Sequence, residues 1–378
     1  SIIEERTVGP GLGKDSIEKS IKAGLMGVLF IFLFMPLYYL LPGVVAIIGL
    51  VFYIVFMVGT LAAFGATLTL PGIAGFILSV GMAVDANVLI SERIREEITA
   101  GKTARAAISA GYHKAFSAIL DSNVTTLITS ALLFIFGTGP VQGFAVTLSI
   151  GIVASMFSAI VVTRVIFDYL SKKNANLNLH MHQFFKKTSI QFLKGRFWAY
   201  GFSLIVIGIG LFAFMQRGHE NYGVEFTGGT LVQIGFKQSV DIAQLRSTLE
   251  KENLKGLTLQ RFGDPKDNQF LVKMAGGETL KIEEAAKTVA GDQAYEILRV
   301  DQVGPSVSTK LTEKALWAVL WSALGILVYL AVRFEWKFAL AAVVAIFHDT
   351  IFTFGMYALS GREINLPIIA AVLTIMGF

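Results

Sequence analysis

Nine long apolar stretches decide what this chain can fold into. A helix of about 20 apolar residues crosses roughly 30 Å of hydrocarbon, and most of these stretches have about that length. Only 16% of the residues are charged, against about 25% in an ordinary globular domain. The sequence therefore predicts an α-helical polytopic membrane protein. The expected spans are 24–41, 44–64, 70–90, 122–137, 143–169, 199–215, 314–332, 338–358 and 366–378, the last one partial.

The distribution of basic residues predicts the orientation of these spans. Residues 171–198 contain six Lys or Arg and no Asp or Glu, and residues 91–120 contain five Lys or Arg against three Glu. Basic segments of this kind gather on the cytoplasmic side of a membrane. Counting spans outward from either segment places residues 1–23 and 218–312 on the opposite, extracytoplasmic side.

Residues 218–312 are the only sizeable polar block. Strand-like alternation at 230–236, 256–262, 268–274 and 294–303 is interrupted by helix-like stretches at 241–253 and 279–290. The order β-α-β-β-α-β is that of a small ferredoxin-like α+β domain. The predicted fold is thus a helical membrane protein with one such extracytoplasmic domain.

An internal repeat divides the chain into two halves. Val8-Gly9-Pro10 reappears as Val303-Gly304-Pro305 with an offset of 295, and Leu70-Pro71 reappears as Leu366-Pro367 with an offset of 296. In both copies three apolar spans follow the Val-Gly-Pro segment. We therefore expect two parallel repeats related by an axis along the membrane normal.

The repeat and the spans together give a domain division. The chain starts without Met in a charged stretch and stops inside an apolar run, so we expect a fragment of a protein with about twelve spans. The expected parts are 1–23, the end of a first extracytoplasmic domain; 24–170, a five-span membrane domain; 171–198, a basic cytoplasmic linker; 199–217, a single span; 218–312, the ferredoxin-like domain; and 313–378, a second, truncated membrane domain.

Two carboxylates fall inside predicted spans. Asp85 lies 14 residues after Pro71, about 21 Å along the helix, and Asp349 lies 12 residues after Lys337, about 18 Å along its helix. A charged Asp at a helix centre costs about 2.5–3.5 kcal/mol, so a proton-relay role is expected. The alternative is a structural carboxylate held by hydrogen bonds between helices. We expect both side chains to face the interior of the bundle, near the interface of its two halves.

Three polar neighbours are candidates to support these carboxylates. Asn87 follows Asp85 by two positions, and His348 and Thr350 flank Asp349. The histidine is expected to point to another helix face, since successive helical residues are about 100° apart. It could be part of a relay, since an imidazole can change charge near neutral pH, but the alternative is a histidine that is simply packed at a helix interface.

The remaining polar features have plainer interpretations. Arg164 is expected to reach the cytoplasmic face or to pair with Asp168 four residues on. The residues 121–123 precede an apolar run and are interpreted as a helix N-cap. Gly228-Gly229 is expected to form a tight turn into the first strand of the ferredoxin-like domain.

Several classes of site are excluded by the sequence. The chain has no Cys, which excludes disulfides and thiolate metal sites, and the pair His180 and His182 is interpreted as part of a solvated linker. The Gly-rich segment 9–14 is not a phosphate-binding loop, because Lys14 is followed by Asp15 instead of Ser or Thr. No cofactor and no nucleic-acid partner are expected, and the chain is not predicted to be an enzyme.

Several longer motifs resemble one family. GMAVDANVLISERIREE at 81–97 is similar to the fourth membrane span of SecD, and GTGPVQGFAVTLSIGI at 137–152 is similar to its last two spans. GVEFTGGT at 223–230, HDT at 348–350 and INLPIIAAVLTIMGF at 364–378 resemble SecF. The resemblance covers nearly the whole chain and implies a fused SecDF arrangement, related to the RND exporters. It also implies that Asp85 and Asp349 match intramembrane carboxylates implicated in proton transport.

The same resemblance implies a function in protein secretion. It indicates an accessory subunit of the bacterial Sec translocase that uses the proton-motive force in the inner membrane. The implied partners are the Sec translocation channel, other translocase subunits, unfolded preprotein, membrane lipids and protons. Two alternatives remain open: an RND-type proton-coupled exporter of small molecules or lipids, and a passive scaffold of the channel. The small size of the polar block 218–312 argues against a drug tunnel, and two intramembrane carboxylates argue against a scaffold.

Overall fold

The computed structural model describes residues 4–174, 177–184, 191–252, 254–276, 279–291 and 294–378. It divides into two compact units. The sheet unit comprises Ser1–Lys19, Gly210–Leu316 and Gly355–Ile368. The helical unit comprises Ser20–Ile209, Trp317–Phe354 and Ile369–Phe378.

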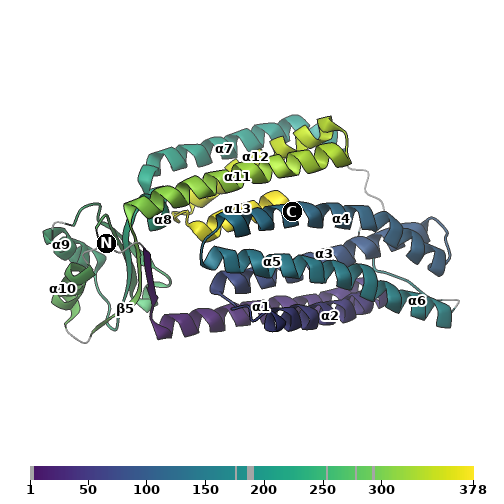
Figure 1. Ribbon diagram of the computed structural model, residues 1–378, viewed down its shortest axis with the longest axis horizontal. Helices are drawn as coiled ribbons and strands as arrows, with labels where there is room; N and C mark the ends of the chain where they lie inside the picture. The colour runs from purple at the N-terminus through teal and green to yellow at the C-terminus, as the bar shows by residue number, and fades with distance from the viewer. Residues whose placement is uncertain (1–3, 175–176, 185–190, 253, 277–278, 292–293) are drawn as a thin grey trace. The chain divides into compact units, whose positions relative to one another are not determined.

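The sheet unit is built on five antiparallel strands in the order β1-β5-β2-β4-β3. Helices α9 and α10 lie together on one face of this sheet (Figure 1). The predicted β-α-β-β-α-β order of the polar block is confirmed. The element bounds are β1 Glu4–Val8, β2 Gly229–Phe236, α9 Ile242–Lys251, β3 Thr258–Phe262, β4 Gln269–Met274, α10 Thr279–Ala290 and β5 Tyr295–Val303.

Alternating apolar residues explain why this sheet has one helix-covered face. Val232 and Ile234 on β2 and Phe270 and Val272 on β4 are fully buried, and they pack with Leu245 of α9. Side chains alternate between the two faces of a strand, so a period of two places each set on one side. Full burial of such a side chain stabilises the fold by about 1.5–3 kcal/mol.

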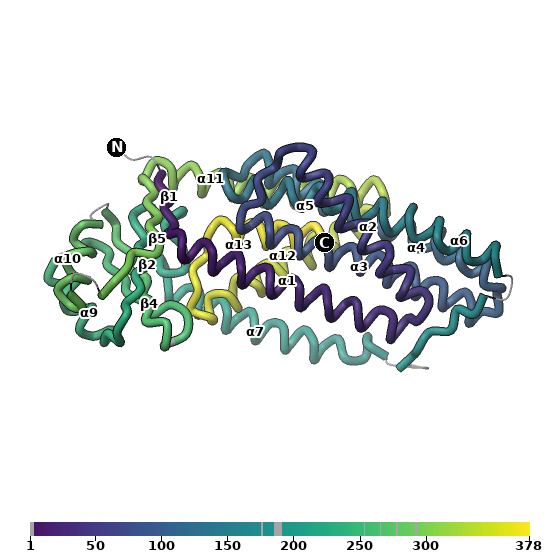
Figure 2. The backbone as a smooth tube through the Cα atoms, turned by 90° about the horizontal axis from the view of Figure 1, so that it is seen from below, coloured from purple at the N-terminus to yellow at the C-terminus, as the bar shows by residue number. Residues whose placement is uncertain are grey.

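Strand β1 is an addition that the sequence did not predict as part of this sheet. Glu4–Val8 pairs antiparallel with β5, with Arg6 opposite Asp301 at the centre of the ladder. Figure 2 shows β1, β5, β2 and β4 in that order. The first residues of the chain thus complete the sheet of a domain that otherwise lies in the second half of the sequence.

Within the described residues, eight helices are long and apolar enough to cross a membrane, and a ninth apolar helix is shorter. This agrees with the predicted number of spans. The helix bounds are α1 Pro10–Tyr39, α2 Leu41–Ala63, α3 Leu70–Thr99, α4 Ala104–Phe136, α5 Pro140–Phe157, α6 Thr163–Lys173, α7 Arg196–Arg217, α11 Pro305–Arg333, α12 Trp336–Leu359 and the shorter α13 Leu366–Gly377; a π-helical turn, Ser158–Val162, joins α5 to α6.

Helix α4 corrects one sequence interpretation. Residues 121–123 were expected to cap the start of a helix, but they lie inside α4, which begins after Thr103. The Thr103 hydroxyl accepts a hydrogen bond from the Ala106 amide and so provides the cap. The helix thus extends well before the apolar run, and residues 121–123 lie in its interior.

Small residues allow α3 and α5 to pack closely. An added Cβ at Gly151 would lie 2.5 Å from the Ser79 hydroxyl oxygen, and one at Gly75 would lie 3.2 Å from the Phe144 ring. Helices in a membrane associate through such small-residue contacts, since lipid provides no hydrophobic drive between them. The α3–α5 pair therefore forms the packed centre of the helical unit.

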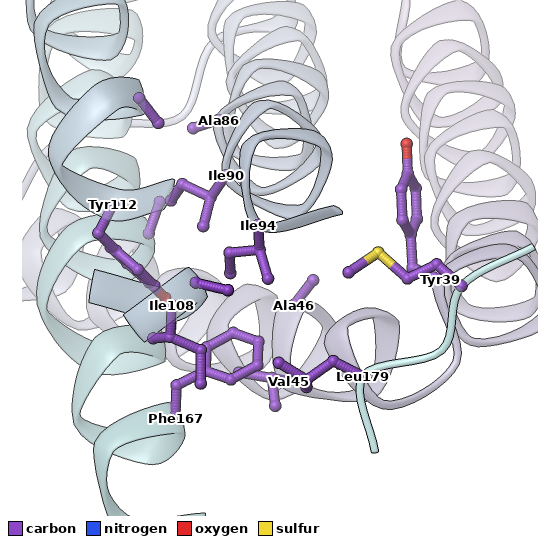
Figure 3. Close-up of a cluster of buried hydrophobic side chains, with 14 of the residues drawn as sticks. Tyr39, Val45, Ala46, Ala86, Ile90, Ile94, Ile108, Tyr112, Phe167 and Leu179 are labelled. Atoms are coloured by element: carbon purple, nitrogen blue, oxygen red, sulfur yellow. The ribbon is translucent and has the colours of Figure 1, made fainter. Parts of the chain in front are cut away.

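A second cluster of buried side chains joins α1, α2, α3, α4 and α6 (Figure 3). It includes Leu179 and Met181, which belong to the segment predicted as a linker and are almost fully buried. The His182 amide donates to the Tyr38 carbonyl over 3.0 Å. The start of this linker is thus docked on the helices, whereas Lys186 and Lys187 lie outside the described residues.

Candidate functional site

Asp349 lies in α12 at one end of a short chain of hydrogen-bonded side chains. One carboxylate oxygen is 2.8 Å from Nδ1 of His348, and Nε2 of the same ring is hydrogen-bonded to the Ser203 hydroxyl of α7. The histidine was expected to point to another helix face, and its ring nevertheless reaches back to the adjacent carboxylate. A carboxylate, an imidazole and a hydroxyl therefore form a continuous chain from α12 to α7.

Helices α7 and α12 can meet at this chain because glycines face each other further along the same pair. An added Cβ at Gly210 would lie 2.7 Å from Cα of Gly355, and one at Gly355 would lie 2.9 Å from Cα of Gly210. At these distances the two helix backbones touch directly, and no side chain fits between them. The contact holds the two helices at a separation that the short Ser203 side chain can bridge.

Asp85 lies on α3, and no hydrogen bond or ion pair of its side chain is found among the described residues. Asn87 is buried and donates to the Ala83 carbonyl of its own helix over 2.9 Å. Thr350 is buried as well and donates to the Ile346 carbonyl over 2.8 Å. Asn87 and Thr350, two of the three predicted supporting residues, thus bond to their own helix, and no hydrogen bond among the described residues joins either of them to Asp85 or Asp349.

Both carboxylates are more exposed than the sequence predicted. Asp85 is an exposed residue, and the Asp349 side chain is 65% exposed. The expectation that both face the interior of the bundle is therefore not met by the described helices. An anion left against hydrocarbon is costly, so these two positions need water or further protein beside them in a membrane.

The repeat counterpart of Asp349 is the fully buried Tyr53 on α2. Its hydroxyl lies 2.5 Å from the Ser79 hydroxyl of α3, and the ring packs beside Phe76. Both hydroxyls are neutral hydrogen-bonding groups at physiological pH. The first half therefore holds a permanent uncharged contact where the second half holds a titratable group.

Asp121 is a candidate residue that the sequence analysis did not assign to any site. Its Oδ1 accepts from the Tyr329 hydroxyl at 2.7 Å and from Arg333 Nε at 2.8 Å, both on α11. The Asp121 side chain is only 13% exposed. The signal in the sequence was the position of Asp121 just before the apolar run 122–137 and of Arg333 just after the run 314–332.

Gly228 and Gly229 form the turn that the sequence predicted. Their φ angles are +71° and +111°, a region that favours glycine. An added Cβ at Gly229 would overlap the Met274 carbonyl oxygen of β4. The pair starts β2 and allows it to lie next to β4, which gives this motif a structural explanation.

Arg164 pairs with Asp168 at 3.7 Å, as expected, and its guanidinium lies 5.4 Å from the centre of the Tyr112 ring. It also lines a cavity of about 360 Å³ with residues of α3 and α4.

Among the described residues, no group of three or more His, Asp or Glu side chains could hold a metal ion. The rings of His180 and His182 pack edge to face, with 6.0 Å between their centres.

Comparison with known proteins gives consistent matches over the whole chain. The model of the family "Protein export membrane protein SecD/SecF, C-terminal" matches residues 1–173 and 281–378, and that of the "SecD/SecF GG Motif" matches residues 221–240. The protein translocase subunit SecDF of Brucella abortus is 34% identical over 388 residues, covering all of this chain and half of the relative. The subunit SecD of Rhodothermus marinus is 64% identical over 169 residues, covering 45% of this chain and 27% of the relative.

Solved structures agree with these relatives. A crystal structure of SecDF, described as a translocon-associated membrane protein from Thermus thermophilus, superposes with a TM-score of 0.91 at 36% identity. It covers all of this chain and 52% of the solved chain. The chain thus spans about half the length of the SecDF relatives that it matches.

Proposed function

Because the chain belongs to the SecD/SecF family of protein export membrane proteins, we propose that it is part of a proton-driven accessory subunit of the bacterial Sec translocase. It would act in the inner membrane, beside the Sec translocation channel and other translocase subunits, on unfolded preprotein during export. The observation that carries the proton-driven step is the hydrogen-bonded chain from Asp349 through His348 to Ser203.

This chain has the chemistry needed to accept and pass a proton. A carboxylate and an imidazole both change charge on protonation, and the imidazole does so near neutral pH. A proton on Asp349 removes the anion that holds the His348 ring, so the ring is free to rotate away from it. The hydrogen bond to Ser203 on α7 would then weaken, and the packing of α12 on α7 would change.

The energy available is sufficient for a modest conformational step. One charge that crosses 100 mV of membrane potential is worth about 2.3 kcal/mol. Since about 1.4 kcal/mol corresponds to a tenfold change in an equilibrium constant, one proton per cycle could shift a two-state equilibrium by about fiftyfold. Asp85 on α3 provides a second titratable position for the same task.

The test replaces each carboxylate by its uncharged isostere in the full-length protein. Asp349→Asn and Asp85→Asn keep shape and polarity but remove the titration. We expect each variant to lose the part of preprotein export that depends on the proton gradient, by at least about tenfold, with the gradient-independent part unchanged. Asp168→Asn, at an exposed position in the middle of α6, is the matched control and should export normally. If both variants export at the wild-type rate, the proposal is wrong.

A further inference from the structure

Three segments of the sheet unit meet at one place, which we call the junction: residues 217–223 at and after the end of α7, residues 360–365 after α12, and Lys273 on β4. The first two segments connect helices to the rest of the chain, whereas the third lies within the sheet. All three belong to the same compact unit. The junction therefore fastens the sheet to the C-terminal turns of α7 and α12.

Arg217 forms the first layer of the junction. Its guanidinium donates to the carbonyls of Ala358 at 3.1 Å, Gly361 at 3.0 Å and Arg362 at 3.0 Å. These carbonyls lie at and after the C-terminus of α12, where the last carbonyls have no partner within the helix. A cation at this end of a helix also interacts favourably with its dipole. The last residue of α7 thus caps α12.

The second layer is a short piece of β-type pairing. Tyr222 and Ile364 form a parallel bridge. The Gly223 amide donates to the Ile364 carbonyl at 2.8 Å, and the Ile364 amide donates to the Asn221 carbonyl at 2.7 Å. Backbone bonds on both sides of Ile364 fix the register of the two segments, and Ile364 itself is buried.

Lys273 joins this pairing to the sheet. Its ammonium group donates to the Tyr222 carbonyl and lies 3.6 Å from a carboxylate oxygen of Glu363. The Lys273 side chain is only 14% exposed, and that of Glu363 is 21% exposed. One cation on β4 therefore holds both segments at once, in a place where little water can replace it.

We propose that Lys273 is a positioning residue that transmits movement of α12 to the sheet, and that the junction stays closed throughout the working cycle. This inference rests on the proposed function. Asp349 precedes Ala358 by nine residues on the same continuous helix, about 14 Å at the α-helical rise. A shift of α12 caused by protonation reaches the capped end of the helix and, through Lys273, the sheet.

The first experiment removes the charge in the full-length protein. Lys273→Met keeps the aliphatic stem and leaves the Glu363 carboxylate and the Tyr222 carbonyl without their partner. We expect export to fall at least tenfold while gradient-driven proton uptake into the same vesicles stays within twofold of wild type. Lys251→Met, at the exposed end of α9, is the control and should change neither. Export at the wild-type rate would overturn the proposal.

The second experiment joins the two connecting segments of the junction by a covalent bond. Neighbouring strands lie about 4.8 Å apart, within the Cα separation that a disulfide needs, so Tyr222→Cys with Ile364→Cys can be oxidised to a cross-link. In the Lys273→Met background the oxidised pair should leave export low, because the cross-link joins the two segments to each other and does not replace the contact from β4. Restored export would show that Lys273 acts only by closing the pairing, and would overturn its role in reaching the sheet. The single-cysteine variants are the controls for oxidation itself.

The cross-link alone also tests the proposal if Lys273→Met fails to fold, as judged by protease resistance. An oxidised pair with Lys273 intact should export normally, because the junction never opens. Loss of export on oxidation would overturn the proposal. Failure of the proposed function is recognised separately, by wild-type export that does not depend on the proton gradient in the same vesicles.

Discussion

The guanidinium nitrogen Nε of Arg333 lies 2.8 Å from Oδ1 of Asp121, and this contact joins α11 of the second half to α4 of the first. The Tyr329 hydroxyl donates to the same oxygen. Gly325, one turn earlier on α11, faces Ile128 of α4 so closely that an added Cβ would lie 2.9 Å from its Cγ2 atom. The two halves of the chain thus meet along α4.

Asp121→Asn should weaken this contact. The variant keeps an acceptor for Tyr329 but leaves Arg333 without a counter-charge, so we expect a lower Tm in detergent and a larger decrease than for Tyr329→Phe. The i,i+4 pair of Arg164 and Asp168 is exposed and is worth little, so Asp168→Asn should leave the Tm nearly unchanged. If the Tm of Asp121→Asn equals that of the wild type, the ion pair of Asp121 and Arg333 does not hold the two halves of the chain together.

Gly355→Val should separate α7 from α12. The new side chain would meet the Gly210 backbone, and such overpacking costs about 1–3 kcal/mol. Gly208→Val is the matched control, because nothing lies within 4 Å of its Cβ position on α7. Thermal unfolding of both variants in detergent checks the difference. Equal melting temperatures would mean that the close glycine contact is not required.

The stability of the sheet unit should depend on pH through Glu225. Burial raises the pKa of Glu225 and of Glu363 above the usual range, despite nearby cations. A carboxyl whose pKa is higher in the folded than in the unfolded state adds to the free energy of unfolding. This contribution is complete below the unfolded pKa of about 4.3, and it is lost as the pH rises through the folded pKa. The charged groups acting on the two carboxyls are Arg6, Arg217, Lys273, Arg299 and Asp301.

Glu225→Gln isolates this effect from the other titrating groups. The amide stays neutral at every pH, so the Tm of the variant relative to wild type should rise between pH 5 and pH 8. Glu250→Gln on α9 is the control, since its Tm difference from wild type should stay constant. A Glu225→Gln difference that falls as the pH rises would contradict the assigned direction.

The predicted membrane orientation can be checked by labelling. The 378 residues contain no Cys, so Lys251→Cys in the sheet unit and Lys194→Cys before α7 introduce single thiols. We expect a membrane-impermeant maleimide to label the first in intact spheroplasts and the second only after permeabilisation. Labelling of both positions from one side would refute the orientation that the basic segments predict.

The sequence predicted the elements better than the contacts between them. Alternation at Val232 and Ile234 was enough to identify β2, because a local period reports which face is buried. No local pattern indicates that Asp121 meets Arg333, since the two lie in different halves of the chain. The docked start of the linker did carry a signal, the alternation of Leu177, Leu179 and Met181 with polar residues.

The candidate site was only partly predictable for the same reason. The position of Asp349 inside an apolar run identified it as an intramembrane acid. Its bond to His348 depends on side-chain rotamers, and Ser203 comes from a helix far earlier in the sequence. The two-fold rotation that we expect between the two repeats remains a prediction. The antiparallel ladder of β1 and β5 is compatible with it, because such a ladder has a local two-fold axis and each strand ends in one copy of Val-Gly-Pro.

Strand β1 also constrains the order of assembly. Its partner β5 follows about 300 residues later, and at a synthesis rate of about 5–20 residues per second it emerges roughly 15–60 s afterwards. Throughout that interval Glu4–Val8 lacks its partner β5, while the helices between are being inserted. The sheet can therefore be completed only as a late, long-range step, and the open edge of β5 is exposed to pairing with other chains until β1 arrives.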